Sequence, residues 1–161
     1  MYYRIETLPK IKLAGKQLTM SYAHDRTPEL WKSFMPFKKL ISNSAAPDLY
    51  SMQRYTNTFS YQDFDPSTPF TKWAAIAVTS FDNIPDIFET YTLQGGLYAV
   101  FKHVGPAMEF RKTFDAIFLS WLPTSDYLID DREHFELLGK KYSNTALDSE
   151  EEIWIPIRLK S

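Results

Sequence analysis

The stretch His134–Leu138, which reads HFELL, sets one carboxylate inside an otherwise apolar and aromatic segment. Successive side chains of a β-strand point to opposite faces, so Glu136 is expected to share a face with His134 and Leu138. Burial of an unpaired charge is costly. A carboxylate in this setting must therefore be paired, protonated or available to a cation.

A second stretch in the same third of the chain, residues 152–157, reads EIWIPI and shows the same alternation. On a strand, Glu152, Trp154 and Pro156 would share one face, and the three isoleucines between them the other. Immediately before it lies the acidic run 148–152, which is expected to be a solvated loop leading into the strand. These two strands are where a functional argument can begin.

The composition limits the classes of protein to consider. With 161 residues, the chain is long enough for one domain or for two small fused halves with a buried core. Aromatic residues make up 16% of it, which favours a pocket for a planar organic ligand, although a well-packed core accounts for them equally. The net charge of -2 comes without a basic stripe, so no direct contact with nucleic acid is expected.

Several classes of site lack the residues they need. The chain has no cysteine, which excludes disulfides, thiol catalysis and cysteine-ligated metals. Its three histidines, His24, His103 and His134, are not spaced as metal ligands, and its 5 glycines form no phosphate-binding loop. No metal and no cofactor are therefore predicted.

The chain shows no membrane or export signal. Its first residues lack the apolar region of a signal peptide, and no segment approaches the ~20 apolar residues of a membrane span. We expect a soluble, cytoplasmic protein without membrane contact.

The first half predicts a strand, a helix and two further strands. Thr27 as N-cap and Pro28 in the first turn begin the helix, and Pro36 predicts a kink or an end near Met35. The predicted elements are a strand over 11–22, a helix from Thr27, a strand over 48–56, a loop over 59–71 and a strand over 72–81.

The second half predicts the same order of elements. Gly95 and Gly96 break the chain, and a helix opened by Pro106 has large apolar residues on one face. The predicted elements are a strand over 97–104, a helix ending at Pro123, extended segments over 127–138, a polar loop over 140–149 and a strand over 152–159. In the repeat, residues 52–55 match 135–138 and residues 73–76 match 152–155.

Two such units can join edge to edge. We therefore predict an α+β fold of two fused β-α-β-β units with pseudo-twofold symmetry, in which an antiparallel sheet carries the helices on one face. A ligand groove would lie between the units. The chain would form a single domain over residues 1–161, with halves of about 1–85 and 86–161.

Several motifs together resemble the GyrI-like small-molecule-binding family, the effector-binding domain of AraC-type and MerR-type regulators. Leu13-Ala14-Gly15 and Glu29-Leu30-Trp31 fit in the first half. The motifs of the second half are more specific: residues 96–101 (GLYAVF), Gly105-Pro106, Trp121-Leu122-Pro123, Phe135-Glu136 and residues 151–157 (EEIWIPI).

The resemblance implies a ligand site in the central groove of a bacterial, multidrug-binding domain. The family's acidic residue, matched here by Glu136, meets lipophilic cations in an aromatic pocket, and the resemblance assigns Trp154 and Tyr98 to the pocket walls. Regulators of this family add a helix-turn-helix region. Here the domain is expected to occupy the whole chain, which argues against regulation of DNA by this chain alone.

Each candidate residue also has a structural interpretation. Glu136 could form an ion pair with Arg54, Arg132 or a lysine, and Trp154 and Tyr98 could belong to the core. His134 could relay a proton to Glu136, bind ligand beside it, or serve only as a hydrogen-bonded structural residue. Trp31 and Trp73 are expected in the core.

Three functions follow from these residues. The first is a sensor or sequestering protein that binds hydrophobic, cationic or aromatic small molecules. The second is a hydrolase of reactive electrophiles, with Glu136 as general acid or base and Tyr98 assisting. The third is a protein antagonist of a partner such as DNA gyrase. A protein partner, or a homodimer through an exposed edge strand, stays open.

Overall fold

The computed structural model describes residues 3–140, 142 and 146–161. Its strands form one antiparallel sheet in the order β1-β6-β9-β8-β3-β4-β2-β5, with β7 paired to β9. The strands are β1 Tyr3–Leu8, β2 Ile11–Met20, β3 Ser44–Tyr55, β4 Phe70–Val78, β5 Glu89–Leu93, β6 Gly96–Val104, β7 Tyr127–Ile129, β8 His134–Leu138 and β9 Glu150–Leu159.

The helices lie between these strands. They are α1 Thr27–Phe34, α2 Phe110–Asp115 and α3 Leu122–Thr124, with the 3-10 helices η1 Met35–Leu40 and η2 Ala107–Glu109 and the π-helical turn η3 Ala116–Trp121. Within the described ranges, no helix combines the length and the apolar character that crossing a bilayer demands.

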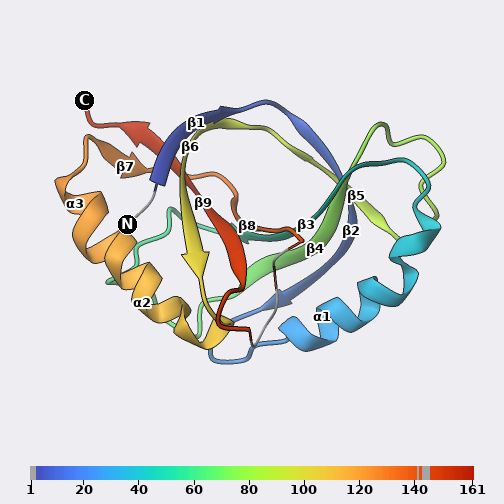
Figure 1. The fold of residues 1–161 in the computed structure, drawn as a ribbon, viewed down its shortest axis with the longest axis horizontal. Helices are drawn as coiled ribbons and strands as arrows, with labels where there is room; N and C mark the ends of the chain where they lie inside the picture. The colour runs from blue at the N-terminus through green and yellow to red at the C-terminus, as the bar shows by residue number, and fades with distance from the viewer. Residues whose placement is uncertain (1–2, 141, 143–145) are drawn as a thin grey trace.

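The order strand, helix, strand, strand occurs twice, as β2-α1-β3-β4 and as β6-α2-β8-β9, and the inner strands β3 and β8 pair at the centre of the sheet. In Figure 1, α1 and α2 lie to either side of these central strands. The predicted α+β fold is confirmed. Two strands were not predicted, β1 and β5, which extend the sheet beside β6 and β2.

The strand register corrects one part of the predicted repeat. Met52 lies opposite Phe135 across the centre, Trp73 lies opposite Met52, and Trp154 lies opposite Phe135. Trp73 therefore matches Trp154, two residues away from the predicted match with Glu152. A shift by two residues leaves every side chain on its face, so the alternation pattern cannot detect it.

The first helix ends where its sequence predicts. Pro28 lies in the first turn of α1, and the chain continues from Met35 as the 3-10 helix η1, which contains Pro36. The helix start differs by one residue from the prediction. Thr27 is the first helical residue rather than the cap, and its backbone N–H donates to Asp25 Oδ1 at 2.9 Å.

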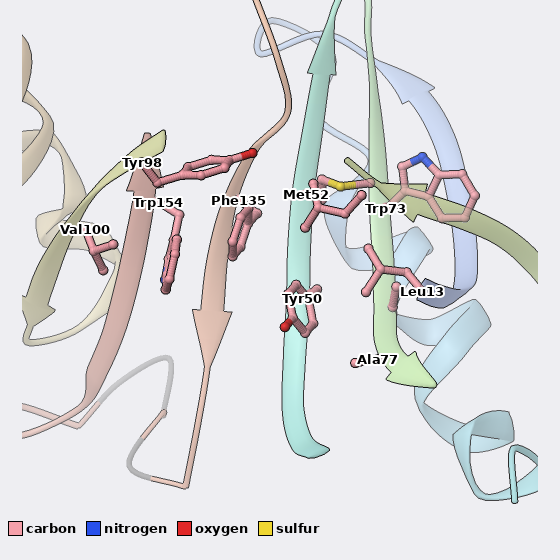
Figure 2. Close-up of a cluster of buried hydrophobic side chains, with 11 residues drawn as sticks. Leu13, Tyr50, Met52, Trp73, Ala77, Tyr98, Val100, Phe135 and Trp154 are labelled. Carbon is pink, nitrogen blue, oxygen red and sulfur yellow. The ribbon is translucent and has the colours of Figure 1, made fainter. Parts of the chain in front are cut away.

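The two faces of the sheet have different cores. One face carries a single cluster that spans both units, shown in Figure 2, with Tyr98, Phe135 and Trp154 on one side and Met52 and Trp73 on the other. The opposite face carries two separate clusters, one beneath α1 and one beneath the α2–η3 helix. The space between those two helix-covered clusters is where the candidate site lies.

Candidate functional site

A cavity of about 970 Å³ lies on the helix-covered face of the sheet. Its floor comes from the central strands, its walls from the α2–η3 helix and from the loop of residues 56–69. Eight of its 18 lining residues are phenylalanine or tyrosine: Tyr22, Tyr55, Phe59, Tyr61, Phe64, Phe110, Phe114 and Phe118. This volume and lining are typical of sites for small organic ligands.

Glu136 lies on the floor of this cavity. The side-chain amide of Gln53 donates to Glu136 Oε1 at 3.1 Å. Burial raises the pKa of Glu136 above its ordinary value of 4.5, while the charge of Lys72 and the hydrogen bond from Gln53 act in the opposite direction. The cavity thus contains an acid whose ionised form is short of partners.

The described residues show no ion pair for Glu136. Arg132 is engaged elsewhere, since its Nε donates to Asp130 Oδ2 at 2.7 Å and its Nη1 to the Gly95 carbonyl at 2.9 Å. Arg54 lies beside Tyr91 instead: burial raises the pKa of Tyr91 to about 12, and the charge and hydrogen bond of Arg54 act in the opposite direction. The structural ion pair considered as an alternative for Glu136 is therefore not formed with either arginine.

His134 lines the same cavity as Glu136, two residues before it on β8. Its ring packs edge-on against Tyr55 and Phe59, at centroid distances of 5.1 and 5.4 Å. Burial, assisted by the charge of Arg132, lowers the pKa of His134 to about 3. The imidazole is thus neutral at pH 7 and adds no positive charge beside the carboxylate.

The loop of residues 56–69 is fastened to the second helix. The Tyr61 hydroxyl donates to Asp115 Oδ1 at 2.6 Å, and the Tyr61 ring stacks on Phe118 with centroids 5.0 Å apart. Phe59 also contacts Phe118, at 5.4 Å. The sequence predicted this segment only as a connecting loop. Its three aromatic residues within six positions, Phe59, Tyr61 and Phe64, are unusual for a solvated loop and could have indicated that it forms a wall of the cavity.

A pair of tyrosine hydroxyls also belongs to the cavity. Tyr22 and Tyr55 lie with their oxygens 2.6 Å apart, and burial raises the pKa of Tyr22 to about 12. Neither tyrosine, nor Gln53 or Lys72, stood out in the sequence. The strand alternation predicts that Gln53 and Tyr55, two residues apart, lie on the same face of the sheet. It does not predict that this face also contains Glu136.

Tyr98 and Trp154 lie on the other face of the sheet. Trp154 is paired with Phe135, whereas Glu136 is paired with Ile153, so Trp154 and Glu136 point in opposite directions. Trp154 stacks on Phe135 at 5.1 Å, and the buried Tyr98 donates its hydroxyl to the Glu133 carbonyl at 2.8 Å (Figure 2). The structure brings His134 together with Glu136 but not Tyr98 and Trp154, which belong to the same core cluster as Trp73.

A second carboxyl, that of Glu151, lies close enough to Glu136 for their charges to interact. Glu151 is 5% exposed and lies on β9, on the same face as Glu136 and two residues from its partner Ile153. Burial, and next the negative charge of Glu136, raise the pKa of Glu151 to about 8. Two residues of the run expected to be a solvated loop, Ser149 and Glu151, are thus buried, and β9 already begins at Glu150.

Glu151→Gln is expected to remove a pH dependence of stability. A carboxyl whose pKa is raised on folding favours the folded state when protonated, and this stability is lost as pH rises from about 4.5 towards 8. The free energy of unfolding of the wild type should fall by about 3–4 kcal/mol over that range beyond any change in the variant. Urea unfolding at pH 5 and pH 8 measures the difference. The exposed Glu109→Gln should behave as the wild type, and equal slopes in all three proteins would refute the assignment.

A family model described as the GyrI-like small molecule binding domain matches residues 1–158. The chain belongs to this GyrI-like family. Membership accounts for the doubled strand-helix-strand-strand unit. No curated protein matches this GyrI-like chain in sequence.

Solved structures share the fold of this GyrI-like chain. The structure of SAV2435 bound to tetraphenylphosphonium has a TM-score of 0.73 and 16% identity, covering 98% of this chain and 94% of that one. EcmrR in a complex with DNA has a TM-score of 0.71 and 14% identity, covering 99% of this chain and 58% of EcmrR. A hydrolase from Listeria innocua has a TM-score of 0.60 and 12% identity, covering 97% and 91%. Identities this low establish the fold alone.

Proposed function

We propose that this protein binds hydrophobic small molecules, cationic or aromatic, in the cavity above Glu136, and that it acts as a sensor or as a sequestering protein. The observation that carries the proposal is a half-buried carboxylate on the floor of an aromatic cavity of about 970 Å³, with Gln53 as its hydrogen-bond donor among the described residues. The tetraphenylphosphonium bound by SAV2435, which has the same fold, supports a ligand of this class.

The physical basis is charge compensation in a site of low polarity. A hydrophobic cation restores the ionised form of Glu136, whose pKa burial raises, and it loses little hydration on entering. Each well-placed ring, such as Tyr55 or Phe118, adds a cation–π attraction of about 0.5–2 kcal/mol. The aromatic wall therefore supplies contact area, and the carboxylate supplies the preference for positive charge.

Calorimetric titration with tetraphenylphosphonium tests the proposal. Glu136→Gln keeps the size of the side chain and removes its charge, so the affinity is expected to fall by about 10–100-fold. Glu109→Gln removes an exposed carboxylate outside the cavity and should bind as the wild type does. Equal affinities for the wild type and Glu136→Gln would remove Glu136 from the mechanism. If no hydrophobic cation or neutral aromatic compound binds, the role of a protein antagonist takes precedence.

The Tyr22–Tyr55 pair favours hydrolysis of reactive electrophiles as a second candidate function. Its hydroxyls could donate to a leaving oxygen while Glu136, with its raised pKa, acts as general acid or base. Tyr98 cannot assist, because its hydroxyl lies beyond the sheet and bonds to the Glu133 carbonyl. Turnover of an aromatic electrophile that Glu136→Gln abolishes and Tyr98→Phe retains would rank catalysis above binding.

A further inference from the structure

The cavity floor contains a positive charge as well as a negative one. Lys72 on β4 lies opposite Gln53 on β3, and Gln53 in turn bonds to Glu136 on β8. Lys72 and Glu136 both line the cavity, with Gln53 between them. The charge of Lys72 acts on Glu136, yet among the residues that the structure describes no ion pair joins the two.

The ammonium group of Lys72 is only partly used by the protein. An ammonium has three N–H donors. In the described part of the chain, its one hydrogen bond goes to Thr27 Oγ1, at 3.3 Å. Lys72 is half-buried on the cavity floor, so donors are left for a ligand that lies between it and Glu136.

These two charges impose different demands on a ligand. A hydrophobic cation without other polar groups gains the attraction of Glu136 but has to approach the like charge of Lys72 as well. A ligand that carries an acceptor oxygen beside its cationic body meets both groups with the opposite sign. The floor therefore discriminates between two classes of ligand that the aromatic wall would accept equally.

We infer that Lys72 is a specificity-determining residue, and that the cavity prefers hydrophobic zwitterions, with a carboxylate or similar acceptor oxygen, over simple hydrophobic cations. The inference rests on the proposed function, because it assigns the ligand class of the same site. It divides the roles on the floor: Glu136 binds the positive group, Lys72 binds the oxygen, and Gln53 holds Glu136 in place.

A matched pair of phosphonium ions tests the inference. (4-Carboxybutyl)triphenylphosphonium is a zwitterion at pH 7, and pentyltriphenylphosphonium has the same body without the carboxylate. In calorimetric titrations the wild type should bind the zwitterion more tightly. Lys72→Met should lower the affinity for the zwitterion by about tenfold, which is the effect of losing one hydrogen bond between charged groups. The same substitution should raise the affinity for the simple cation. The order of preference is thus expected to reverse.

Controls separate this result from a general loss of charge or of folding. Lys12→Met removes an exposed lysine that does not line the cavity and should keep the wild-type preference. Lys72→Gln, which is polar and uncharged, should lose the preference even if Lys72→Met is poorly folded. A ratio of the two affinities that neither Lys72 variant changes would overturn the inference and leave the proposed function standing. Failure of both ions to bind the wild type would also overturn the inference, and the proposed function falls with it if neutral aromatic compounds fail to bind as well.

Discussion

Replacing Trp154 by alanine is expected to lower the free energy of unfolding by about 3–5 kcal/mol. Trp154 is 4% exposed, and its ring stacks on Phe135 and meets Tyr98 edge-on at 5.8 Å. Its indole N–H also donates to Glu152 Oε1 at 3.2 Å. The truncation therefore leaves a large void in the cluster that spans both units, and urea unfolding followed by circular dichroism measures the loss.

The same residue should have little effect on ligand binding. Trp154→Phe, which retains most of the packing, should bind tetraphenylphosphonium with wild-type affinity, because the cavity lies across the sheet. The half-buried Trp31 provides the matched control for stability, since Trp31→Ala should cost less than Trp154→Ala. A strong loss of affinity in folded Trp154→Phe would instead favour the pocket wall that the family resemblance assigned to Trp154.

The affinity for a permanently charged cation is expected to rise with pH. Tetraphenylphosphonium does not titrate, so the protein alone sets the dependence. Below the raised pKa of Glu136 the carboxyl is protonated. Each pH unit by which the pH is lowered further should therefore reduce the affinity by about tenfold. His134 stays neutral because its pKa lies near 3, and ionisation of Glu151 near pH 8 should tighten binding further.

Calorimetric titrations between pH 4.5 and pH 8.5 measure this dependence. Glu136→Gln should lose the steep part of the profile, and Glu151→Gln only the rise near pH 8. Lys72 is the other charged group on the floor, and its charge lowers the pKa of Glu136. Lys72→Met should therefore move the steep part to higher pH, and should raise the affinity only above that part, where Glu136 is ionised in both proteins. A flat profile for the wild type would exclude an ionised Glu136 from cation binding.

Local patterns predicted most of the fold. Pro28 and Pro36 mark both ends of α1 within one residue, since proline restricts the backbone locally. The edge strands β1 and β5 were not predicted. They depend on distant partners, β6 and β2, and carry mostly half-buried or exposed side chains. Their formation is decided by pairing, which a local pattern does not contain.

The sequence predicted two neighbouring residues of the candidate site, Glu136 and His134, rather than the whole set. Glu136 is prominent because its own strand is apolar. Gln53 and Lys72 come to it only through the register of β4, β3 and β8, in which the bonded pair Gln53 and Glu136 is 83 residues apart. The family resemblance assigned Trp154 to the pocket wall, but the face of the sheet on which Trp154 lies follows from its pairing with Phe135.

The central pairing of β3 with β8 makes the cavity dependent on the contact between the two units. Gln53 belongs to one unit and Glu136 to the other, so the floor exists only while the two units are joined along this seam. A molecule held there would act as a non-covalent cross-link between them. Bound ligand would then make separation of β3 from β8 less favourable. Slower amide hydrogen exchange in these two strands would report the occupancy, without any change of shape elsewhere.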